Sequence, residues 1–477
     1  MSLLRKFLPA GTIFFILFAL SFYYAWTSEG VYDAGDGIQH YLISRYSFRH
    51  PELFLHHWGK PFFTLVSFPF SQFGFLGINV FNILCGLAAA WVTYRIAQQL
   101  GYTYPYVSIF FVYFTPLYFV IMISGLTEIF FSLVLVSSVF LIIRNKFTVA
   151  FLIISFLPMI RSEGLFLFPL YITIGLYRRK YFSLLFLATG TLLYSIAGYF
   201  YFGDFFWLQT QNPYKGAGAL YGSGELLHFI KNNEFILGTP LVVLFIAGIL
   251  FLFYHGVRLL MKREKRDLFP EEILLVFGIS FTYLAVHSVL RWKGLGSLGL
   301  IRVMAGVAPL TALIAGRGID LLFSFLRNRK IIQYALLGII LILVIRVPFK
   351  QYHLPFSLAG EEKVIKEAGD WFRQSEYKDR KIFYLYPFLS FTLDIDPFNR
   401  SKVADLWGIP SVNPEAAVAE KDIVIWDAHF GPNECRLPLD SLANNKYFRV
   451  IKTFRPEKEF KVLGGYPFEV YIFERIP

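Results

Sequence analysis

The sequence predicts an all-α polytopic membrane protein with about eleven spanning helices and a small C-terminal α/β domain. Three observations predict this fold class. Hydrophobic residues make up 56% of the 477 residues and charged residues only 16%, which is far from the composition of soluble domains. Long apolar runs recur along most of the chain, and short basic clusters separate them. Lipid offers the backbone no hydrogen bonds, so such runs must form helices.

The first apolar run, residues 8–26, follows Arg5 and Lys6. A signal peptide has a shorter apolar region and a small-residue cleavage site, and no such site follows here. We therefore expect a retained first helix. Further helices are predicted over residues 78–97, 106–123, 126–143, 147–160, 165–176, 182–202, 235–257, 272–290, 300–325 and 331–347.

The basic clusters predict the orientation, because Lys and Arg collect in cytoplasmic loops. With this helix count all clusters fall on one side, so we expect a plasma (inner) membrane protein with a cytoplasmic N-terminus. The opposite side receives loops 27–77, 203–234 and 291–299 and the C-terminal tail. The clusters are Arg5/Lys6, Arg95, Arg144/Lys146, Arg178/Arg179/Lys180, Lys262/Arg263/Lys265/Arg266 and Arg327/Arg329/Lys330. The net charge of +12 is thus explained by topology and does not indicate a nucleic-acid partner.

The composition changes near residue 348, where charges return. A helix-like stretch at 361–373 and strand-like runs at 381–386, 422–426 and 470–474 predict a small α/β domain. We therefore expect a transmembrane domain over 1–347, including the outer loop 27–77, and an extracytoplasmic domain over 348–477. A metal site is considered for five residues of that domain, but their spacing matches no ligand signature, which favours turn and surface roles. These residues are Asp394, Asp396, Asp427, His429 and Glu434.

The first outer loop carries the most informative polar residues: Asp33, Asp36, His40, His57 and Lys60. The aromatic and apolar residues between them indicate helices that lie along the membrane rather than free coil. Carboxylates held there would lie at the boundary between lipid and water, where an enzyme meets the head of a lipid-linked substrate. A carboxylate there is suited to take a proton from an attacking hydroxyl, and a Lys or Arg to neutralise a departing phosphate.

The choice of base between Asp33 and Asp36 stays open, with Asp36 favoured. Asp36 and His40 are four residues apart and share a face if a helix begins there. The alternative is that Asp36 only caps that helix.

Two later outer turns also carry ionisable residues in apolar surroundings, where they are costly and often functional. In the first, Glu128 opens a helix, and Arg161 and Glu163 lie in the next outer turn. An ion pair between them that only holds helices together is the alternative. In the second, Arg291 and Arg302 flank a glycine-rich turn whose glycines allow close backbone approach to a ligand.

The stretch Asp33-Ala34-Gly35-Asp36, followed by Trp58-Gly59-Lys60-Pro61, resembles the first-loop pattern of GT-C glycosyltransferases. Among these enzymes, the protein O-mannosyltransferases and the lipid A aminoarabinose transferase have the most similar pattern. The resemblance covers the helical part and implies a GT-C fold, a catalytic base near Asp36 and a phosphate contact at Lys60. The chain departs from the pattern in that its acids are three apart and Phe62 follows Pro61.

The resemblance implies a polyprenyl-phosphate-sugar-dependent glycosyltransferase, a hexosyltransferase, that inverts the anomeric carbon. The acceptor is expected to be a glycan, lipid or protein on the outer face of the plasma membrane. His40, His57, Glu128, Arg161, Glu163, Arg291 and Arg302 are the expected substrate and phosphate contacts beside Lys60. No cofactor is implied with certainty, since some GT-C enzymes use a divalent metal and others do not. The alternatives are a transporter or flippase of lipid-linked sugars, an O-antigen ligase or polymerase, and a scaffold.

Overall fold

The structure is a computed structural model that describes residues 10–212, 222–262, 268–326 and 329–477. The chain divides into two compact units. The helical unit combines Met1–Thr27 with Phe54–Pro355, and the sheet unit combines Ser28–Leu53 with Phe356–Pro477. This division differs from the predicted boundary at 347/348, because residues 28–53 of the predicted outer loop group with the C-terminal part and not with the helices.

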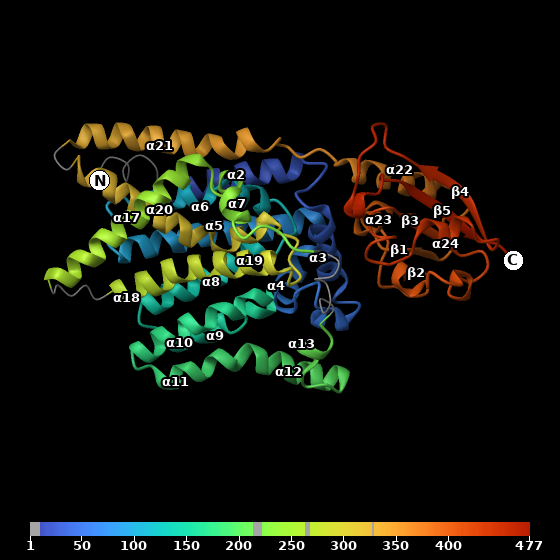
Figure 1. Ribbon diagram of the computed structural model, residues 1–477, viewed down its shortest axis with the longest axis horizontal. Helices are drawn as coiled ribbons and strands as arrows, with labels where there is room; N and C mark the ends of the chain where they lie inside the picture. Colours follow the sequence, from blue (N-terminus) through green and yellow to red (C-terminus); the bar gives the residue numbers. More distant parts are fainter. Residues whose placement is uncertain (1–9, 213–221, 263–267, 327–328) are drawn as a thin grey trace. The chain divides into compact units, whose positions relative to one another are not determined.

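Each apolar run of the sequence forms helical structure in the helical unit (Figure 1). The α-helices of this unit are α2 (Ala10–Thr27), α4 (Pro61–Ser71), α5 (Phe75–Gln99), α6 (Val107–Tyr113), α7 (Pro116–Met122), α8 (Glu128–Ile143), α9 (Phe147–Ile154), α10 (Phe168–Tyr177), α11 (Tyr181–Leu184), α12 (Thr189–Phe202), α13 (Trp207–Thr210), α15 (His228–Lys231), α16 (Asn233–Ile236), α17 (Thr239–Lys262), α18 (Phe269–Glu271), α19 (Ile279–Lys293), α20 (Ala308–Ser324) and α21 (Lys330–Gln351). Shorter 3₁₀ turns and one π-helical segment, Glu272–Gly278, connect several of them.

Within the described residues, six helices, counting their attached turns, are long and apolar enough to cross a membrane by length and composition. These six are Phe75–Gln99, Tyr181–Phe202, Thr239–Val257, Phe269–Lys293, Ile301–Ser324 and Lys330–Gln351, and five shorter apolar helices accompany them. A multi-pass membrane protein is therefore confirmed, while the count of about eleven spans stays a prediction. The predicted helix 106–123 is two helices, because Pro116 lacks an N–H and begins α7.

The orientation prediction rests partly on basic residues whose structure is not described. Arg5, Lys6, Arg263, Lys265, Arg266 and Arg327 lie outside the described residues. Of the others, Arg95 lies near the end of α5, and Lys330 begins α21. The residues that line one cavity include both Gln99, at the end of α5, and Lys330, so these two helix ends meet at one end of the helical unit.

Small residues bring α17 and α20 close together in the helical unit. A Cβ added at Gly248 would lie 1.8 Å from the Ile314 carbonyl oxygen, and one at Gly318 would lie 2.1 Å from the Leu244 carbonyl oxygen. Only glycine therefore allows the two backbones to approach this closely, as in other helix pairs within membranes. Arg302 precedes α20 at one end, and Asp320 lies near its other end.

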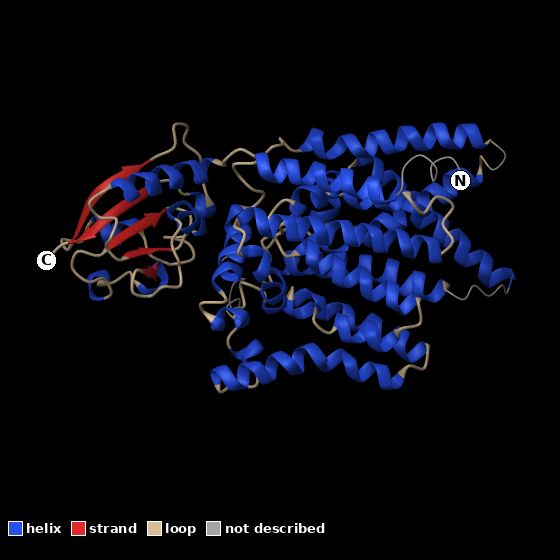
Figure 2. Cartoon of the chain, turned by 180° about the vertical axis from the view of Figure 1, so that it is seen from behind, coloured by secondary structure: helices blue, strands red, loops and turns tan. Residues whose placement is uncertain are grey.

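The sheet unit contains one mixed sheet of five strands in the order β2-β1-β3-β5-β4 (Figure 2). β1 (Ile382–Tyr384) pairs in parallel with β2 (Val403–Asp405) and β3 (Ile423–Asp427), while β5 (Val470–Arg475) is antiparallel to β3 and β4 (Phe448–Phe454). The helices of this unit are α3 (Ala34–Tyr46), α22 (Gly360–Gln374), α23 (Pro387–Leu393) and α24 (Leu439–Ala443). The α/β class and the three predicted strands are confirmed.

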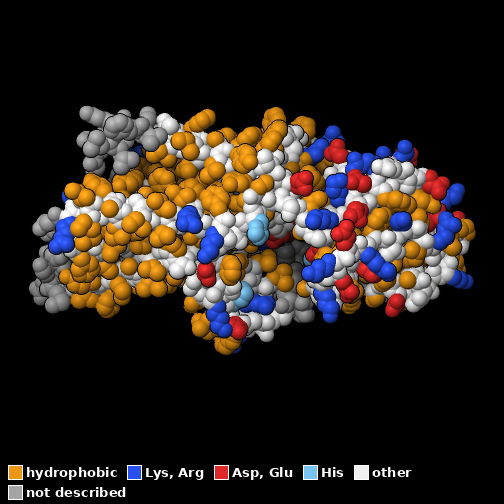
Figure 3. All heavy atoms as spheres, turned by 90° about the horizontal axis from the view of Figure 1, so that it is seen from above, with side chains coloured by type: hydrophobic (Ala, Val, Ile, Leu, Met, Phe, Trp, Pro, Cys, Tyr) orange, Lys and Arg blue, Asp and Glu red, His pale blue; other side chains and the backbone are white. Residues whose placement is uncertain are grey.

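Surface chemistry separates the two units (Figure 3). Hydrophobic side chains cover most of the visible surface of the helical unit, and Lys, Arg, Asp and Glu gather on the sheet unit. Phe200 and Phe253, for example, are 83% and 73% exposed. An aqueous protein would bury such side chains, so this surface fits a lipid environment.

Candidate functional site

Helix α3 carries the two candidate acids and shows how their roles differ. Asp33 is the N-cap of the helix, and its Oδ1 accepts a hydrogen bond from the backbone amide of Asp36 at 3.4 Å. Asp36 lies in the first turn, where the helix dipole stabilises a negative charge. His40 lies one turn later and is 3% exposed. The helix thus places Asp36 and His40 on one face, and the capping residue is Asp33 rather than Asp36.

The rest of the sheet unit holds α3 in place through polar contacts. Arg45 donates to the Tyr41 hydroxyl at 2.6 Å and forms an ion pair with Asp394 at 3.3 Å. Downstream of α3, His50 lies 3.0 Å from the Asp396 carboxylate. Asp394 and Asp396, considered in the sequence for a metal, therefore contact the first-loop segment.

Backbone pairing fixes the chain just before α3. The amides of Glu29 and Gly30 both donate to the Phe356 carbonyl oxygen, and the Phe356 amide donates to the Ser28 hydroxyl. A Cβ at Gly30 would lie 2.3 Å from the Ser357 carbonyl oxygen, so the approach requires glycine. The candidate acids are thus built into the fold of the C-terminal part.

Several ionisable groups with displaced pKa values lie in this unit. Burial raises the pKa of Glu362 to about 7, with the Glu361 and Asp33 charges adding to the effect. Burial likewise raises the pKa of Asp427 to about 6, although its carboxylate accepts hydrogen bonds from the amides of His429 and Phe430. Displaced pKa values of this kind cluster at functional sites more often than elsewhere.

Lys60 and His57 belong to the helical unit. Lys60 has φ 60° and ψ 97° at the N-cap of α4, and a non-glycine residue at positive φ is a strained conformation that recurs at functional sites. The Thr64 hydroxyl donates to the Gly59 carbonyl oxygen at 2.8 Å, which holds the turn. The His57 ring lies 4.9 Å from the ring of the fully buried Trp207. Burial lowers the pKa of His57, so its imidazole is neutral at pH 7.

Four of the predicted residues form a buried ionic cluster in the helical unit. Arg161 donates to Glu128 and to Glu163, at 2.6 Å in each case. Glu128 is fully buried, and its Oε1 also lies 3.6 Å from Nε of Arg302. His287 lies 3.7 Å from Glu163, close to the Tyr283 hydroxyl contact with the same carboxylate. Two guanidinium groups and two carboxylates thus balance one another among α8, the turn that carries Arg161 and Glu163, and the turn before α20.

Arg291 lies apart from this cluster in contacts of its own. Its Nη1 donates to the Ser297 carbonyl oxygen at 3.1 Å, and its backbone oxygen accepts from the Gly224 amide. His228 contacts the Gly299 carbonyl oxygen at 2.7 Å. These contacts hold the glycine-rich turn against residues 224–228, and Arg291 bonds to both.

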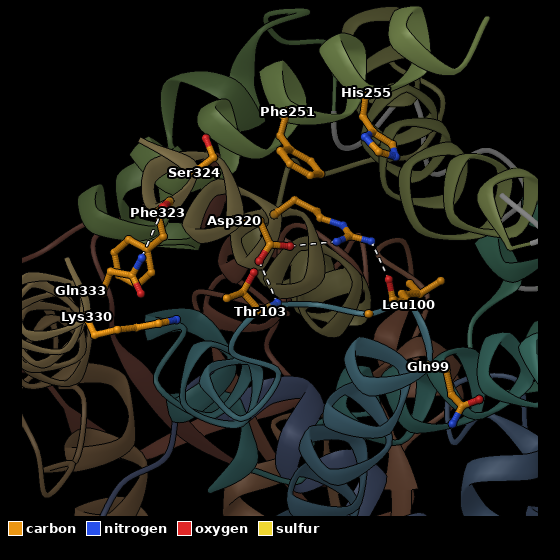
Figure 4. Close-up of a pocket in the computed structure, with 12 residues that line it drawn as sticks. Gln99, Leu100, Thr103, Phe251, His255, Asp320, Phe323, Ser324, Lys330 and Gln333 are labelled. Carbon is orange, nitrogen blue, oxygen red and sulfur yellow. Dashed lines mark hydrogen bonds and ion pairs between the residues drawn. The ribbon is translucent and has the colours of Figure 1, made fainter. Parts of the chain in front are cut away.

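A cavity lies at the other end of α20 (Figure 4). Its volume is about 760 Å³, and Arg317 and Asp320 line it. Arg317 pairs with Glu272 at 2.6 Å and with Asp320 at 2.8 Å, and it also donates to the Leu100 carbonyl oxygen. The charge of Arg317 is therefore balanced by Glu272 and Asp320, which indicates that Arg317 holds helices together.

The sequence did not reveal some participants. Trp207 packs on His57. In the sequence it only follows an apolar run, and nothing there indicates this contact. Glu362 interacts with the charge of Asp33, and Tyr386 contacts Glu361, only through the fold of the sheet unit. The one signal for them in the sequence was that two adjacent glutamates, Glu361 and Glu362, lie at the start of a helix. Within the described residues no group of three or more His, Cys, Asp or Glu is placed to hold a metal ion.

Comparison with known proteins identifies the fold. No protein-family model and no curated protein matches the chain. Among solved structures, the chain is similar to ArnT from Cupriavidus metallidurans bound to undecaprenyl phosphate, with 11% identity, a TM-score of 0.57 and 98% of each chain covered. It is also similar to the apo state of the same protein, with 12% identity and a TM-score of 0.60, over 97% of this chain and 98% of that one.

These identities are low, so the similarity concerns the fold. ArnT is the lipid A aminoarabinose transferase, a GT-C glycosyltransferase, and the fold expected from the first-loop residues is thereby confirmed. The similarity extends further than the sequence resemblance did, because it includes the C-terminal part.

Proposed function

We propose that this chain, which has the fold of ArnT, is a membrane glycosyltransferase. It transfers a sugar from a polyprenyl-phosphate-linked donor to an acceptor on the outer face of the plasma membrane, with inversion at the anomeric carbon. The observation that carries the proposal is the fold similarity over 98% of the chain to a structure bound to undecaprenyl phosphate. A polyprenyl chain needs an apolar environment for its tail, which the helical unit offers, and a polar one for its phosphate.

In this reaction Asp36 is the base. The acceptor hydroxyl oxygen attacks the anomeric carbon as the bond from that carbon to the phosphate oxygen breaks, and the hydroxyl proton passes to the Asp36 carboxylate. Asp36 is favoured over Asp33 because the Asp33 side chain accepts the amide hydrogen of Asp36 as helix cap. His40, on the same helix face, positions a substrate group.

Lys60 and Arg302 stabilise the departing phosphate in this proposal. Lys60 has the strained backbone described above, which supports a functional role. Arg161 is shared by Glu128 and Glu163, so we assign these three to holding the helices and orienting Arg302. Arg291 shapes the glycine-rich turn, and the neutral His57 positions donor or acceptor.

The test is transfer of radiolabelled sugar from a panel of polyprenyl-phosphate sugars by the purified full chain. Wild type is compared with Asp36→Asn and with Asp33→Asn, which is a matched control because asparagine also caps helices and tolerates positive φ. We expect wild type and Asp33→Asn to transfer, and Asp36→Asn to lose at least about 100-fold in rate.

Other outcomes change the proposal. Loss of transfer in Asp33→Asn alone moves the base to Asp33. A folded wild type that binds lipid-linked sugars but neither transfers nor hydrolyses them contradicts the enzyme and favours a transporter or flippase. The anomeric configuration of the product, read by NMR, tests inversion.

A further inference from the structure

A cavity of the sheet unit lies where β3 ends and β5 begins. Its volume is about 320 Å³, within the range of roughly 300–1,000 Å³ that is usual for ligand pockets. Three segments line it: the end of β3 with the loop that follows, the start of α24, and the residues just before β5. The lining includes two aromatic residues, Trp426 and Tyr466, three prolines, and two carboxylates, Asp440 and Glu469.

Hydrogen bonds hold the walls of this cavity together. The Ala428 amide donates to the Glu469 carbonyl oxygen at 3.0 Å, next to the antiparallel pairing of β3 with β5. The Asn433 side chain donates to the carbonyl oxygens of His429 at 2.7 Å and Leu463 at 2.8 Å. The loop after β3 is thus tied at two points to the segment before β5, so the cavity is built into the fold of this unit.

The two aromatic rings of the lining differ in exposure. Trp426 is 3% exposed, and its Nε1 donates to the Leu437 carbonyl oxygen at 2.8 Å. Tyr466 is 44% exposed, and its carbonyl oxygen accepts a hydrogen bond from the Val462 amide at 2.9 Å. A Cβ at Gly464, which has φ 77°, would lie 2.7 Å from the Tyr466 ring, so the turn before Tyr466 requires glycine. The backbone of Tyr466 is therefore fixed, while its ring is accessible to a ligand.

The two carboxylates determine which ligand chemistry fits the cavity. Glu469 accepts a hydrogen bond from the Tyr471 hydroxyl at 2.6 Å and pairs with Arg455 at 2.7 Å, which balances its charge. Within the described part of the chain, neither the Asp440 carboxylate nor the Tyr466 hydroxyl bonds to a protein group. An ionised carboxylate only accepts hydrogen bonds, so a ligand here must supply donors. The described lining contains no Lys or Arg, which disfavours a phosphate or another anion.

A sugar ring has the complementary chemistry. Its hydroxyl groups donate to carboxylates, and its C–H face packs against an aromatic ring. An ammonium ligand fits less well, because Arg455 already balances Glu469 and leaves one carboxylate, that of Asp440, without a cation.

We propose that this cavity binds a neutral sugar residue of a glycan acceptor, with Tyr466 against the sugar ring and Asp440 accepting from its hydroxyl groups. The proposal rests on the transferase function above and assigns the acceptor to the class of glycans. None of the residues assigned to the reaction lines the cavity. The cavity therefore holds the acceptor and takes no part in the bond-making step.

The first experiment measures sugar binding without transfer. Full-length protein in lipid nanodiscs is titrated with methyl hexosides and neutral oligosaccharides, and saturation-transfer NMR reports binding. Maltoside detergents are avoided, because their sugar head groups would compete. We expect wild type to bind at least one of these sugars, and Tyr466→Ala and Asp440→Ala each to weaken binding by about tenfold. Tyr466→Phe keeps the ring and the affinity, and Asp379→Ala, at an exposed aspartate of the same unit, is the charge control.

Three outcomes of this experiment overturn the proposal. The first is a folded wild type that binds no neutral sugar. The second is undiminished binding in both Tyr466→Ala and Asp440→Ala, which places the sugar elsewhere. The third is stronger binding of choline or ethanolamine than of every neutral sugar, with the same loss in the variants, which makes the cavity an amine site.

The second experiment separates the acceptor site from the transferase function. With a glycan acceptor, Tyr466→Ala is expected to raise the acceptor KM about tenfold and to leave kcat and the donor KM unchanged, and Tyr466→Phe restores the acceptor KM. A purely structural role would instead lower kcat and the melting temperature. If wild type binds sugars at the cavity but transfers none, the transferase function fails and the sugar site stands. If wild type transfers to a glycan and Tyr466→Ala keeps the acceptor KM, the sugar site fails and the transferase function stands.

Discussion

Asp33 accepts a hydrogen bond from the backbone amide of Asp36, so one candidate acid organises the helix turn on which the other lies. Two neighbouring acids of similar appearance in the sequence thus have separable roles. Asp33 caps the helix, and its own backbone is left-handed with φ 59°. Asp36 presents its carboxylate from the first turn of the helix.

The capping role of Asp33 predicts that its substitution by alanine and by asparagine will differ in their effect on stability. Asp33→Ala loses the cap and forces alanine into a left-handed conformation, and we expect a loss of about 1–2 kcal/mol in unfolding free energy of the sheet unit. Asp33→Asn keeps the cap and costs less than half as much. Calorimetric unfolding of the full chain measures both. Equal losses in the two variants would show that the side-chain cap contributes nothing.

The buried cluster predicts a large effect at Arg161. Arg161→Gln leaves Glu128 and Glu163 buried without their shared cation, so we expect about 3–5 kcal/mol of destabilisation. Lys231→Gln is the control, because Lys231 pairs with Glu225 at an exposed site and its loss costs less than about 1 kcal/mol. Unfolding in mixed micelles provides the measurement. Similar stability of the two variants would contradict the structural role given to Arg161.

The raised pKa of Glu362 predicts a pH-dependent stability. Its pKa is about 7 in the folded chain and 4.5 in the unfolded reference, so the folded state binds the proton more tightly. The resulting stabilisation is complete below pH 4.5 and disappears as the pH rises through 7. Glu362→Gln keeps a neutral acceptor for the Ala359 amide, and we expect it to stabilise the sheet unit at pH 8 by about 1–3 kcal/mol and not at pH 4. Melting temperatures across this pH range test the prediction, and a variant whose melting temperature tracks wild type at every pH would refute it.

The packing of Trp207 predicts that Gly198 tolerates no side chain. A Cβ at Gly198 would lie 1.7 Å from the Trp207 ring, whose Nε1 donates to the Tyr194 carbonyl oxygen at 2.7 Å. Gly198→Ala must displace Trp207 from His57, and we expect about 1–3 kcal/mol of destabilisation. Gly338→Ala in α21 meets nothing within 4 Å and is expected to be neutral or stabilising. Thermal unfolding in detergent compares them, and equal behaviour of the two alanines would exclude the clash.

The helices were predictable because apolar runs of membrane length have one solution in lipid. The split at Pro116 and the extra helix α4 (Pro61–Ser71) were missed. Length and composition alone did not signal them, although Pro116 and Pro61 each stand at the first position of a helix. The short strands β2 and β4 also escaped notice, since their burial depends on partners far away in the chain.

The sequence indicated which residue types form the site. It indicated less well which of these residues contact one another. Glu128, Arg161, Glu163 and Arg302 are brought together as ionic partners, which favours the ion-pair alternative left open by the sequence. The grouping of α3 with residues 356–477 was not predictable. It depends on backbone hydrogen bonds to Phe356 and on ion pairs with Asp394 and Asp396, which spacing does not encode.

That discontinuous unit has a consequence for biosynthesis. Residues 28–53 leave the ribosome before the helices of residues 54–355, and their packing partners, 356–477, follow those helices. The segment that carries Asp36 must therefore wait, without its hydrogen-bonding partners, until the intervening helices have been synthesised. Synthesis of residues 356–477, rather than insertion of the first helix, is the event that finishes this part of the protein.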